Sequence, residues 1–291
     1  MFRLQKSAYM NAKSNIKLGV SINYWDCGEL LQSVVANIRP HAYHLSIVFQ
    51  THSNFGNIWG TADKMALERV MNSPIGVRPD AAIRCERPLA DINNPKLLML
   101  GGIHETAKRN AGLDAARSAG CTHYMSMDAD EFYIATELEM VKLLMDFPYA
   151  SDGSKYDVAV CQMQTYYKSP SYRIVPPEDY YVPIMYRFTD SLKFVPTSFP
   201  VLVDPSRRCE VSNPLILSRN SCQMHHMSYV RSNIARKLIN SSAMLNFDVE
   251  QLKQCISHYN NWQYPQQAMM IGKTLSLIDV ESVENVFGVL F

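Results

Sequence analysis

The sequence predicts an α/β fold in which a mixed, mostly parallel sheet is flanked by helices. Apolar residues alternate at positions 18–22, recur at helical spacing over 30–38, and form a continuous run at 45–49. This is the strand–helix–strand order of a βαβ unit, in which the second strand is buried on both faces. The same order repeats as far as residue 166, so parallel strands are expected to dominate this part of the chain.

The remaining elements of this half follow from the same periodicities. Helices are predicted over residues 62–71, 103–119 and 136–147, and strands over 81–85, 122–127 and 156–166. Pro40 and Gly120 mark two helix ends, since proline cannot continue a helix and glycine accepts the left-handed backbone that often follows one. Capping-box pairs mark three helix starts: Asp26 with Glu29, Thr136 with Glu139, and Asp248 with Gln251.

The chain changes character after residue 168, where prolines become frequent. Short strands, in mixed or antiparallel pairs, are expected over residues 182–188, 191–195 and 201–203. Residues 222–229 fit a strand or an extended turn, and helices are expected over 232–245 and after Asp248. The segment from residue 273 fits a strand or a helix equally. We therefore divide the chain into a loose N-terminal arm (1–16), an α/β half (17–168) and a third region with C-terminal helices (169–291), the last two sharing one compact domain.

Charge and cysteine content indicate which partners and which cellular compartment to expect. The 291 residues carry 28 Lys and Arg and 27 Asp and Glu, a formal net charge of +1, which argues against nucleic acid as a partner because such proteins usually carry a basic excess. The seven cysteines stand singly, with no CxxC pair, so a reducing compartment is expected. No apolar run approaches the ~18 residues of a membrane span, and the N-terminus lacks the apolar core of a signal peptide; we therefore expect a cytoplasmic protein.

The strongest chemical feature is an acidic cluster at the end of a predicted strand. Asp128 and Asp130 come directly after the apolar run 122–127 and are followed by Glu131. On an extended backbone, residues two apart project to the same side, so both carboxylates are expected to face one bound ion. Mn²⁺ and Mg²⁺ prefer oxygen ligands and bridge to phosphates, and ligands of open parallel sheets sit beyond the carboxyl ends of the strands. The sequence therefore predicts a metal–diphosphate site; the alternative is an exposed acidic turn.

The segments 108–113, 119–124 and 127–132 together resemble the middle of the GT-A-type nucleotide-sugar glycosyltransferases, and of the family 2-like members among them. In that family, a helix beginning with an Arg-Asn-x-Gly-like segment precedes a hydrophobic strand that ends in an Asp-x-Asp motif. The likeness covers residues 16–170 well and extends more weakly to His225 and His226. It implies a GT-A, Rossmann-like fold, with 17–168 as the nucleotide-sugar-binding half and 169–291 as the acceptor side.

The resemblance assigns roles to residues that spacing alone leaves open. The implied donor-binding residues are Asn23, Tyr24, Arg109 and Asp128, and the implied ligands of Mn²⁺ or Mg²⁺ are Asp128 and Asp130. Core packing of Tyr24 and a surface ion pair of Arg109 are the competing interpretations. In one departure from the family pattern, no carboxylate follows the second strand, so the amide of Gln50 or Asn54 would have to meet the base edge.

A second cluster lies late in the chain. Some metal-dependent relatives complete the shell of the ion with a late histidine, which makes His225 and His226 candidate ligands. Adjacent residues of a strand point to opposite faces, so at most one of the two is expected to reach the ion. Arg231 and Lys237, near the start of the next predicted helix, are expected to neutralise the diphosphate. The alternative is a structural histidine pair over a helix cap.

The base that would deprotonate an acceptor hydroxyl is less well defined. Glu178 and Asp179 lie in the proline-rich region on the expected acceptor side, with Glu131 and Asp204 as rivals and a plain solvated loop as the alternative. A retaining reaction needs no such base. Aromatic side chains available to stack on sugar rings, or simply to pack, are Tyr166, Tyr167, Tyr172, Tyr180, Tyr181 and Trp262.

These features favour a metal-dependent glycosyltransferase that moves a hexose or pentose from a nucleotide-diphosphate sugar, with a UDP-sugar favoured, to a hydroxyl of a glycan or protein acceptor. A sugar-nucleotide nucleotidyltransferase is the first alternative, but it needs a glycine-rich phosphate loop after the first strand, and segment 23–28 supplies none. The second alternative is a non-catalytic carbohydrate-binding or assembly protein on the same fold. The intact pair of Asp128 and Asp130 argues against it.

Overall fold

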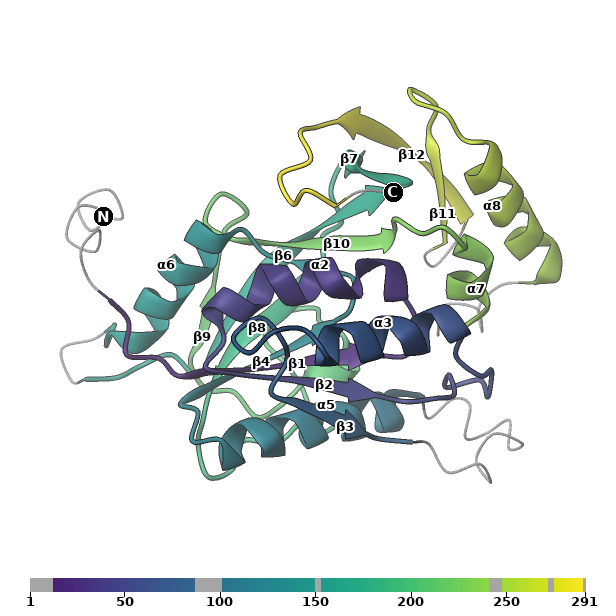
Figure 1. The fold of residues 1–291 in the computed structure, drawn as a ribbon. Coiled ribbons are helices and arrows are strands. Elements are labelled where there is room, and N and C mark those ends of the chain that lie inside the picture. The colour runs from purple at the N-terminus through teal and green to yellow at the C-terminus, as the bar shows by residue number, and fades with distance from the viewer. Residues whose placement is uncertain (1–12, 87–100, 150–152, 241–247, 272–274, 290–291) are drawn as a thin grey trace.

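The computed structural model describes residues 13–86, 101–149, 153–240, 248–271 and 275–289 (Figure 1). Its strands are β1 (Leu18–Tyr24), β2 (His44–Phe49), β3 (Ala81–Arg84), β4 (His123–Asp128), β5 (Glu131–Phe132), β6 (Val158–Tyr167), β7 (Ser169–Val175), β8 (Tyr181–Arg187), β9 (Pro214–Ile216), β10 (Gln223–Tyr229), β11 (Ala268–Ile271) and β12 (Leu275–Ser282). Its helices are α2 (Gly28–Ile38), α3 (Thr61–Met71), α5 (Gly101–Ser118), α6 (Ala135–Asp146), α7 (Ile234–Ile239) and α8 (Val249–Asn261).

Within the described residues, twelve strands form one mixed sheet with the order β11-β12-β7-β6-β8-β4-β1-β2-β3; β9 and β10 pair with β6, and β5 pairs with β10. The strands β3-β2-β1-β4 are parallel, and helices lie in each of their connections. Helices α2 and α3 cover one face of these strands and α5 covers the other (Figure 1). Because β2 and β4 lie on opposite sides of β1, the strand order reverses here, and such a reversal opens a crevice at the carboxyl ends of the strands.

Beyond β4 most strand pairs are antiparallel, so the prediction of a mostly parallel sheet is wrong for the sheet as a whole, whereas the antiparallel pairing expected after residue 168 is confirmed for β8. β8 runs antiparallel to β4 and β6, and β7 runs antiparallel to β6 and β12. Only Lys168 separates β6 from β7, which is too short for the crossover that a parallel pair needs. The strands expected over 191–195 and 201–203 are irregular segments, and the described part of the segment from 273 begins with a strand, β12.

One of the three predicted capping boxes is present: Asp248 and Gln251 exchange hydrogen bonds at the start of α8. The other two are absent because the helices begin elsewhere: Cys27 is the N-cap of α2 and Ile134 is the N-cap of α6. The acidic members of the predicted boxes have other partners. Glu29 accepts a hydrogen bond from Ser232 Oγ at 2.6 Å, and Glu139 lies 2.6 Å from His41 Nδ1. Helix α7 ends at Ile239, and the predicted continuation over 241–245 lies outside the described residues.

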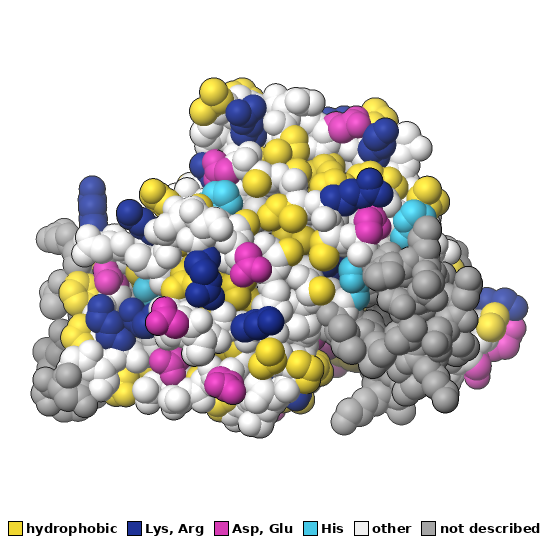
Figure 2. Space-filling model, turned by 90° about the horizontal axis from the view of Figure 1, so that it is seen from below, with side chains coloured by type: hydrophobic (Ala, Val, Ile, Leu, Met, Phe, Trp, Pro, Cys, Tyr) yellow, Lys and Arg dark blue, Asp and Glu magenta, His cyan; other side chains and the backbone are white. Residues whose placement is uncertain are grey.

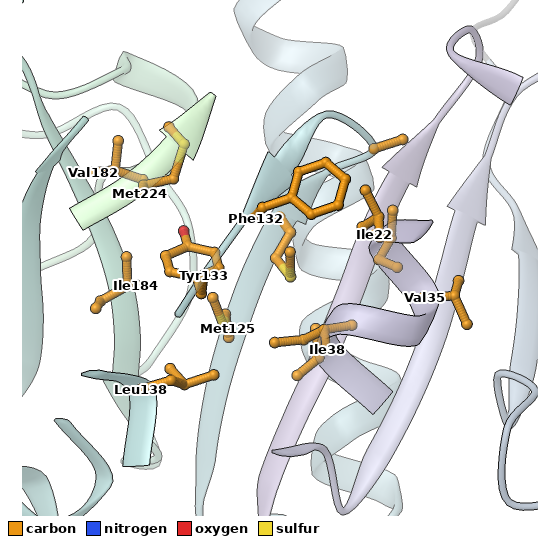
Figure 3. Packing of buried hydrophobic residues seen from close by; sticks show 14 of the residues in the cluster. Ile22, Val35, Ile38, Met125, Phe132, Tyr133, Leu138, Val182, Ile184 and Met224 are labelled. Carbon is orange, nitrogen blue, oxygen red and sulfur yellow. The ribbon is translucent and has the colours of Figure 1, made fainter. Parts of the chain in front are cut away.

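The largest hydrophobic cluster lies between the parallel strands and helices α2 and α6. Figure 3 shows Ile22 from β1, Ile38 from α2, Met125 from β4 and Phe132 from β5 packed together. All four side chains are fully buried, and each such burial stabilises the fold by about 1.5–3 kcal/mol. This cluster fixes the position of β4, whose carboxyl end carries the acidic residues.

A second, aromatic cluster joins the C-terminal helices to β6 and β7. The rings of Tyr167 and Trp262 lie edge to face with centroids 5.3 Å apart, and Tyr172 packs on Trp262 at the same distance. Tyr167 and Trp262 are buried. These three aromatics, which the sequence offered as sugar-stacking residues, therefore pack against one another in a core.

On the face seen in Figure 2, basic and acidic side chains are interspersed. Within the described part of the chain, no helix has both the length and the apolar character required to cross a membrane. Of the predicted N-terminal arm, residues 1–12 lie outside the description, and Asn15 N donates a hydrogen bond to Asp146 at 2.7 Å.

Candidate functional site

Asp128 lies at the crevice between β1 and β4. The two strands are in register, with Asn23 opposite Asp128. Asn23 Nδ2 donates to Asp128 Oδ1 at 3.1 Å, Arg109 Nη2 to the same oxygen at 3.3 Å, and Arg207 Nη2 to Oδ2 at 3.0 Å. Desolvation alone would raise the pKa of Asp128, but Arg109 and Arg207 hold the pKa of this carboxyl well below its usual range. Asp128 is therefore an ionised acceptor shared by two arginines.

Arg109 is buried and held on several sides. Its side chain is 1% exposed, Nη1 donates to Ser126 Oγ at 2.8 Å, and Nε donates to Ser206 Oγ at 3.1 Å. Helix α5, which carries Arg109, approaches the sheet closely at Gly112, where an added Cβ would lie only 2.6 Å from Tyr124 Oη. Glycine permits this approach. A surface ion pair is therefore not the role of Arg109.

Arg207 is a residue of this site that the sequence analysis missed. Its guanidinium bridges Asp128 and Glu131, and the side chains of Arg207 and Glu131 are only 5% and 2% exposed. Asp204 Oδ1 accepts a hydrogen bond from Ser206 N at 2.7 Å and so caps the short 3₁₀ turn that carries Arg207. The Asp-Pro pair that starts this turn can be recognised in the sequence. The contact of Arg207 with Asp128, 79 positions away, cannot. Glu131 and Asp204, the rival bases, thus serve in positioning Arg207.

Asp130 is the centre of a second ion cluster. Arg231 Nη2 donates to Asp130 Oδ2 at 2.5 Å and Lys237 Nζ donates to the same oxygen at 3.2 Å, while His226 Nε2 lies 3.7 Å from Oδ1. The carboxylate is 4% exposed. Burial alone would raise the pKa of Asp130, but Lys237, His226 and Arg231 hold it well below its usual range. Asp130 is therefore ionised as well.

The backbone is not extended through Asp130, and the sequence prediction is wrong on this point. β4 ends at Asp128, and Ala129 and Asp130 form a turn that leads into β5. Because β5 pairs with β10 instead of continuing β4, the side chains of Asp128 and Asp130 meet different partners. The acidic motif therefore builds two ion clusters, one around Arg109 and Arg207 and one around Arg231 and Lys237.

The histidine pair divides between the core and the crevice, as strand alternation predicts. His225 is 7% exposed, its Nδ1 lies 2.9 Å from Tyr166 Oη, and burial lowers its pKa to about 4. His226, on the other face of β10, lies near Asp130 and its side chain is 23% exposed. Of the two, His226 is the one placed to meet a ligand.

Two side chains of the Asp130 cluster, Asp130 and His226, could each supply one ligand to a divalent ion. The 3.7 Å between Asp130 Oδ1 and His226 Nε2 is too long for a hydrogen bond, and two metal–ligand bonds of about 2.1 Å span such a gap. No group of three His, Cys, Asp or Glu side chains suited to a metal occurs among the described residues. Most of the coordination shell would therefore come from water and phosphate oxygens, as is common for Mg²⁺.

Helix α7 brings Lys237 to this cluster and is held by both halves of the protein. Its apolar residues Ile234 and Leu238 are buried in the aromatic cluster. The α2 and α3 region binds its polar side and the segment just before it: Ser232 N donates to Glu29 at 3.0 Å, and Arg236 Nη1 donates to Asp63 at 2.6 Å. The position of Lys237 over Asp130 thus depends on contacts with both sides of the crevice.

Two residues assigned to the base pocket lie inside the protein. Tyr24 is 1% exposed, and its hydroxyl donates to the Asp63 carbonyl at 2.7 Å. Gln50 is 2% exposed, and its Oε1 lies 2.9 Å from His104 Nε2. Of the residues named for the base, Asn23 is the one bonded directly to Asp128.

The two candidate bases differ in their surroundings. Glu178 lines a pocket of about 170 Å³ that His226 and Lys237 also line, and Thr165 Oγ1 donates to Glu178 Oε2 at 2.5 Å. Asp179 is exposed and accepts a hydrogen bond from a glutamine amide at 3.0 Å. Glu178 is therefore the member of this pair that shares a pocket with residues of the Asp130 cluster.

Comparisons with known proteins do not assign this chain to a family. No protein-family model matches the chain, and a search of the curated proteins finds no match.

Proposed function

We propose that this chain is a glycosyltransferase with a GT-A-like fold that transfers a sugar from a nucleotide-diphosphate sugar, with UDP-sugars favoured, to an acceptor hydroxyl. The observation that carries the proposal is the Asp130 cluster, in which a carboxylate, an imidazole and a lysine meet at the strand-order reversal and border a pocket that contains Glu178. Diphosphate ligands of parallel sheets bind at such reversals.

The local charge balance supports joint binding of a metal and a diphosphate. The ion clusters join the carboxylates of Asp26, Asp128, Asp130 and Glu131 to the cations of Arg109, Arg207, Arg231 and Lys237. The four negative and four positive charges cancel. A dianionic diphosphate alone would leave an excess of negative charge, and a divalent ion alone an excess of positive charge; together they preserve the balance in a site of low solvent exposure.

The residues then divide the work of the reaction. Asp130 and His226 would hold Mn²⁺ or Mg²⁺, which when bound neutralises charge on the departing diphosphate. Asp128 orients Arg109 and Arg207, and Lys237 would donate a hydrogen bond to a phosphate oxygen. The acceptor oxygen bonds to the anomeric carbon, the bond from that carbon to the diphosphate oxygen breaks with its electron pair on the diphosphate, and Glu178 takes the acceptor proton.

The alternative of a nucleotidyltransferase has less support. The turn after β1 contains one glycine, Gly28, whose N–H already donates to Asp63 Oδ1 at 2.9 Å. A phosphate loop of free backbone N–H groups is therefore not found among the residues that follow β1.

Thermal unfolding with a panel of nucleoside diphosphates, with and without Mn²⁺, tests the proposal. UDP with Mn²⁺ should stabilise the parent by about 2.7 kcal/mol at a ligand concentration 100-fold above Kd. Asp130→Asn should remove the Mn²⁺-dependent part, whereas Asp179→Asn, at an exposed position outside the pocket, should keep it. Each variant is compared with its own ligand-free unfolding temperature, because Asp130→Asn also changes an ion cluster.

The proposal fails if no nucleotide stabilises the parent or if the Mn²⁺ dependence survives Asp130→Asn. Hydrolysis of a labelled UDP-sugar by the full chain then separates an enzyme from a binding protein. Turnover that is lost in Asp130→Asn and kept in Asp179→Asn identifies the enzyme.

A further inference from the structure

The pocket beside the Asp130 cluster has a floor made by two parallel strands. Thr165 of β6 and His226 of β10 are register partners, so their side chains lie on one face of the sheet, and Met163 lies two residues before Thr165 on the same face. The register shifts after His226, and both Ser228 and Tyr229 also line the pocket. The register partners Gln164 and His225 occupy the opposite, buried face. The alternation of the strands therefore builds the pocket and aims His226 at both the pocket and Asp130.

One wall of the pocket is polar and firmly held. Glu178 accepts a hydrogen bond from Thr165 Oγ1 at 2.5 Å. Arg219 ties the loop that carries Glu178 to β6, because its guanidinium donates both to the Glu178 carbonyl and, at 2.7 Å, to the Met163 carbonyl. The Glu178 carboxylate is thus fixed at the pocket, while Lys237 completes the polar side.

The other wall is apolar. Leu238 of α7 and Met270 and Ile271 of β11 line it, and Leu238 and Met270 are buried in the aromatic cluster. With a volume of about 170 Å³, the pocket is smaller than the 300–1,000 Å³ typical of drug-sized ligands. Its occupant is therefore a small molecule, or the end of a larger one, with both a polar edge and an apolar face.

We propose that this pocket is the acceptor subsite and that it takes a single, uncharged sugar ring. A sugar ring combines hydroxyl groups at its edge with an apolar face of C–H groups, which matches the two walls. In the protein without metal, a carboxylated sugar would bring its charge against Glu178, whereas Lys237 already pairs with Asp130 at 3.2 Å, so an anion is repelled more than it is attracted. The inference rests on the proposed function, because it is His226 and Lys237 that join this pocket to the diphosphate site.

Saturation-transfer NMR on the full chain tests this assignment with a panel of methyl hexopyranosides and methyl glucuronide. At least one neutral glycoside should bind, and the glucuronide should bind at least tenfold more weakly. Ile271→Trp, which fills the pocket, should weaken the neutral glycoside at least tenfold. Leu277→Trp, at a position that is 54% exposed on the neighbouring strand, should leave it unchanged, and Glu178→Gln should reduce the discrimination against the glucuronide.

Selective ¹³C labelling of methionine methyl groups provides a readout that needs no variant. The glycoside should shift the methyl resonances of Met163 and Met270, which line the pocket. The resonance of Met65, which is 53% exposed on α3, should not shift. The assignment is overturned if no glycoside binds, if the glucuronide binds as well as the neutral sugars, or if neither methionine shifts. Glycoside binding at the pocket without nucleotide stabilisation would instead refute the proposed transferase and leave a sugar-binding site.

Discussion

Lys237 Nζ lies 3.2 Å from Asp130 Oδ2, on the carboxylate whose other oxygen lies 3.7 Å from His226 Nε2. A cation therefore lies beside the two groups that we propose hold a divalent ion. Two cations at such short range repel each other even at the effective dielectric constant of a protein surface. Lys237 should consequently oppose metal binding until a diphosphate draws its charge away from Asp130.

Lys237→Met is expected to raise the affinity for Mn²⁺ alone by about tenfold or more and to lower the affinity for UDP in the presence of Mn²⁺. Methionine keeps much of the length of lysine and removes the charge. Electron paramagnetic resonance of free Mn²⁺ measures the first effect, and calorimetry measures the second. Lys253→Met, at an exposed pair with Glu250, serves as the control. An unchanged Mn²⁺ affinity would show that Lys237 does not compete with the ion.

Arg207→Met is expected to destabilise the fold by about 3–5 kcal/mol, because it leaves the buried carboxylate of Glu131 without its partner. Adding Glu131→Gln should recover at least about 1 kcal/mol by removing that charge. Urea unfolding measures both effects. Arg173→Met breaks an exposed pair with Glu281 and should cost no more than about 1 kcal/mol. Equal losses of unfolding free energy in Arg207→Met and Arg173→Met would contradict a structural role for the ion pairs of Arg207.

Gly112→Ala is expected to destabilise the protein, although alanine is the better helix former by about 1 kcal/mol. An added Cβ at this position would clash with Ser21 and lie 2.6 Å from Tyr124 Oη, and overpacking of this kind costs about 1–3 kcal/mol. Because α5 would be pushed from the sheet, nucleotide stabilisation should fall with it. Ser118→Ala, on the exposed end of the same helix, should be neutral or stabilising. A stabilised Gly112→Ala variant would refute the close packing.

The features that the sequence predicted well depend on local spacing. The periodicities over 18–22 and 30–38 correspond to β1 and α2, because a buried face requires a fixed repeat whatever the partner. The division of His225 and His226 followed from alternation in the same way. For this reason the sequence could predict the parallel core of the sheet and the position of Asp128 at the end of a strand.

The parts that the sequence did not reveal depend on contacts between distant segments. Arg207 binds residues 76 and 79 positions away, and no local pattern marks which arginine will fill that space. The turn at Asp130 arises because β5 pairs with β10, a tertiary choice that overrides the simple extension of β4. The neighbours of β6 are likewise a tertiary choice: the sequence predicted antiparallel pairs after residue 168 but not which strands they join.

The stability of the fold should fall between pH 6.5 and pH 4.5, and His123 should account for a large share of the loss. His123 is 2% exposed at the start of β4, and burial, with Arg187 nearby, lowers its pKa to about 3. As the pH falls below the ordinary histidine value of about 6.5, the unfolded chain takes up a proton that the folded chain does not, so folding becomes less favourable. Two pH units below that value correspond to about 3 kcal/mol. Carboxylates with unfolded pKa values near 4 contribute mainly below this window. Urea unfolding of the parent and of His123→Leu at pH 7 and pH 4.5 measures the effect. The free energy of unfolding should differ between the two pH values by about 3 kcal/mol less in the variant than in the parent. An equal difference in both proteins would show that the folded state protonates His123 as readily as the unfolded chain does.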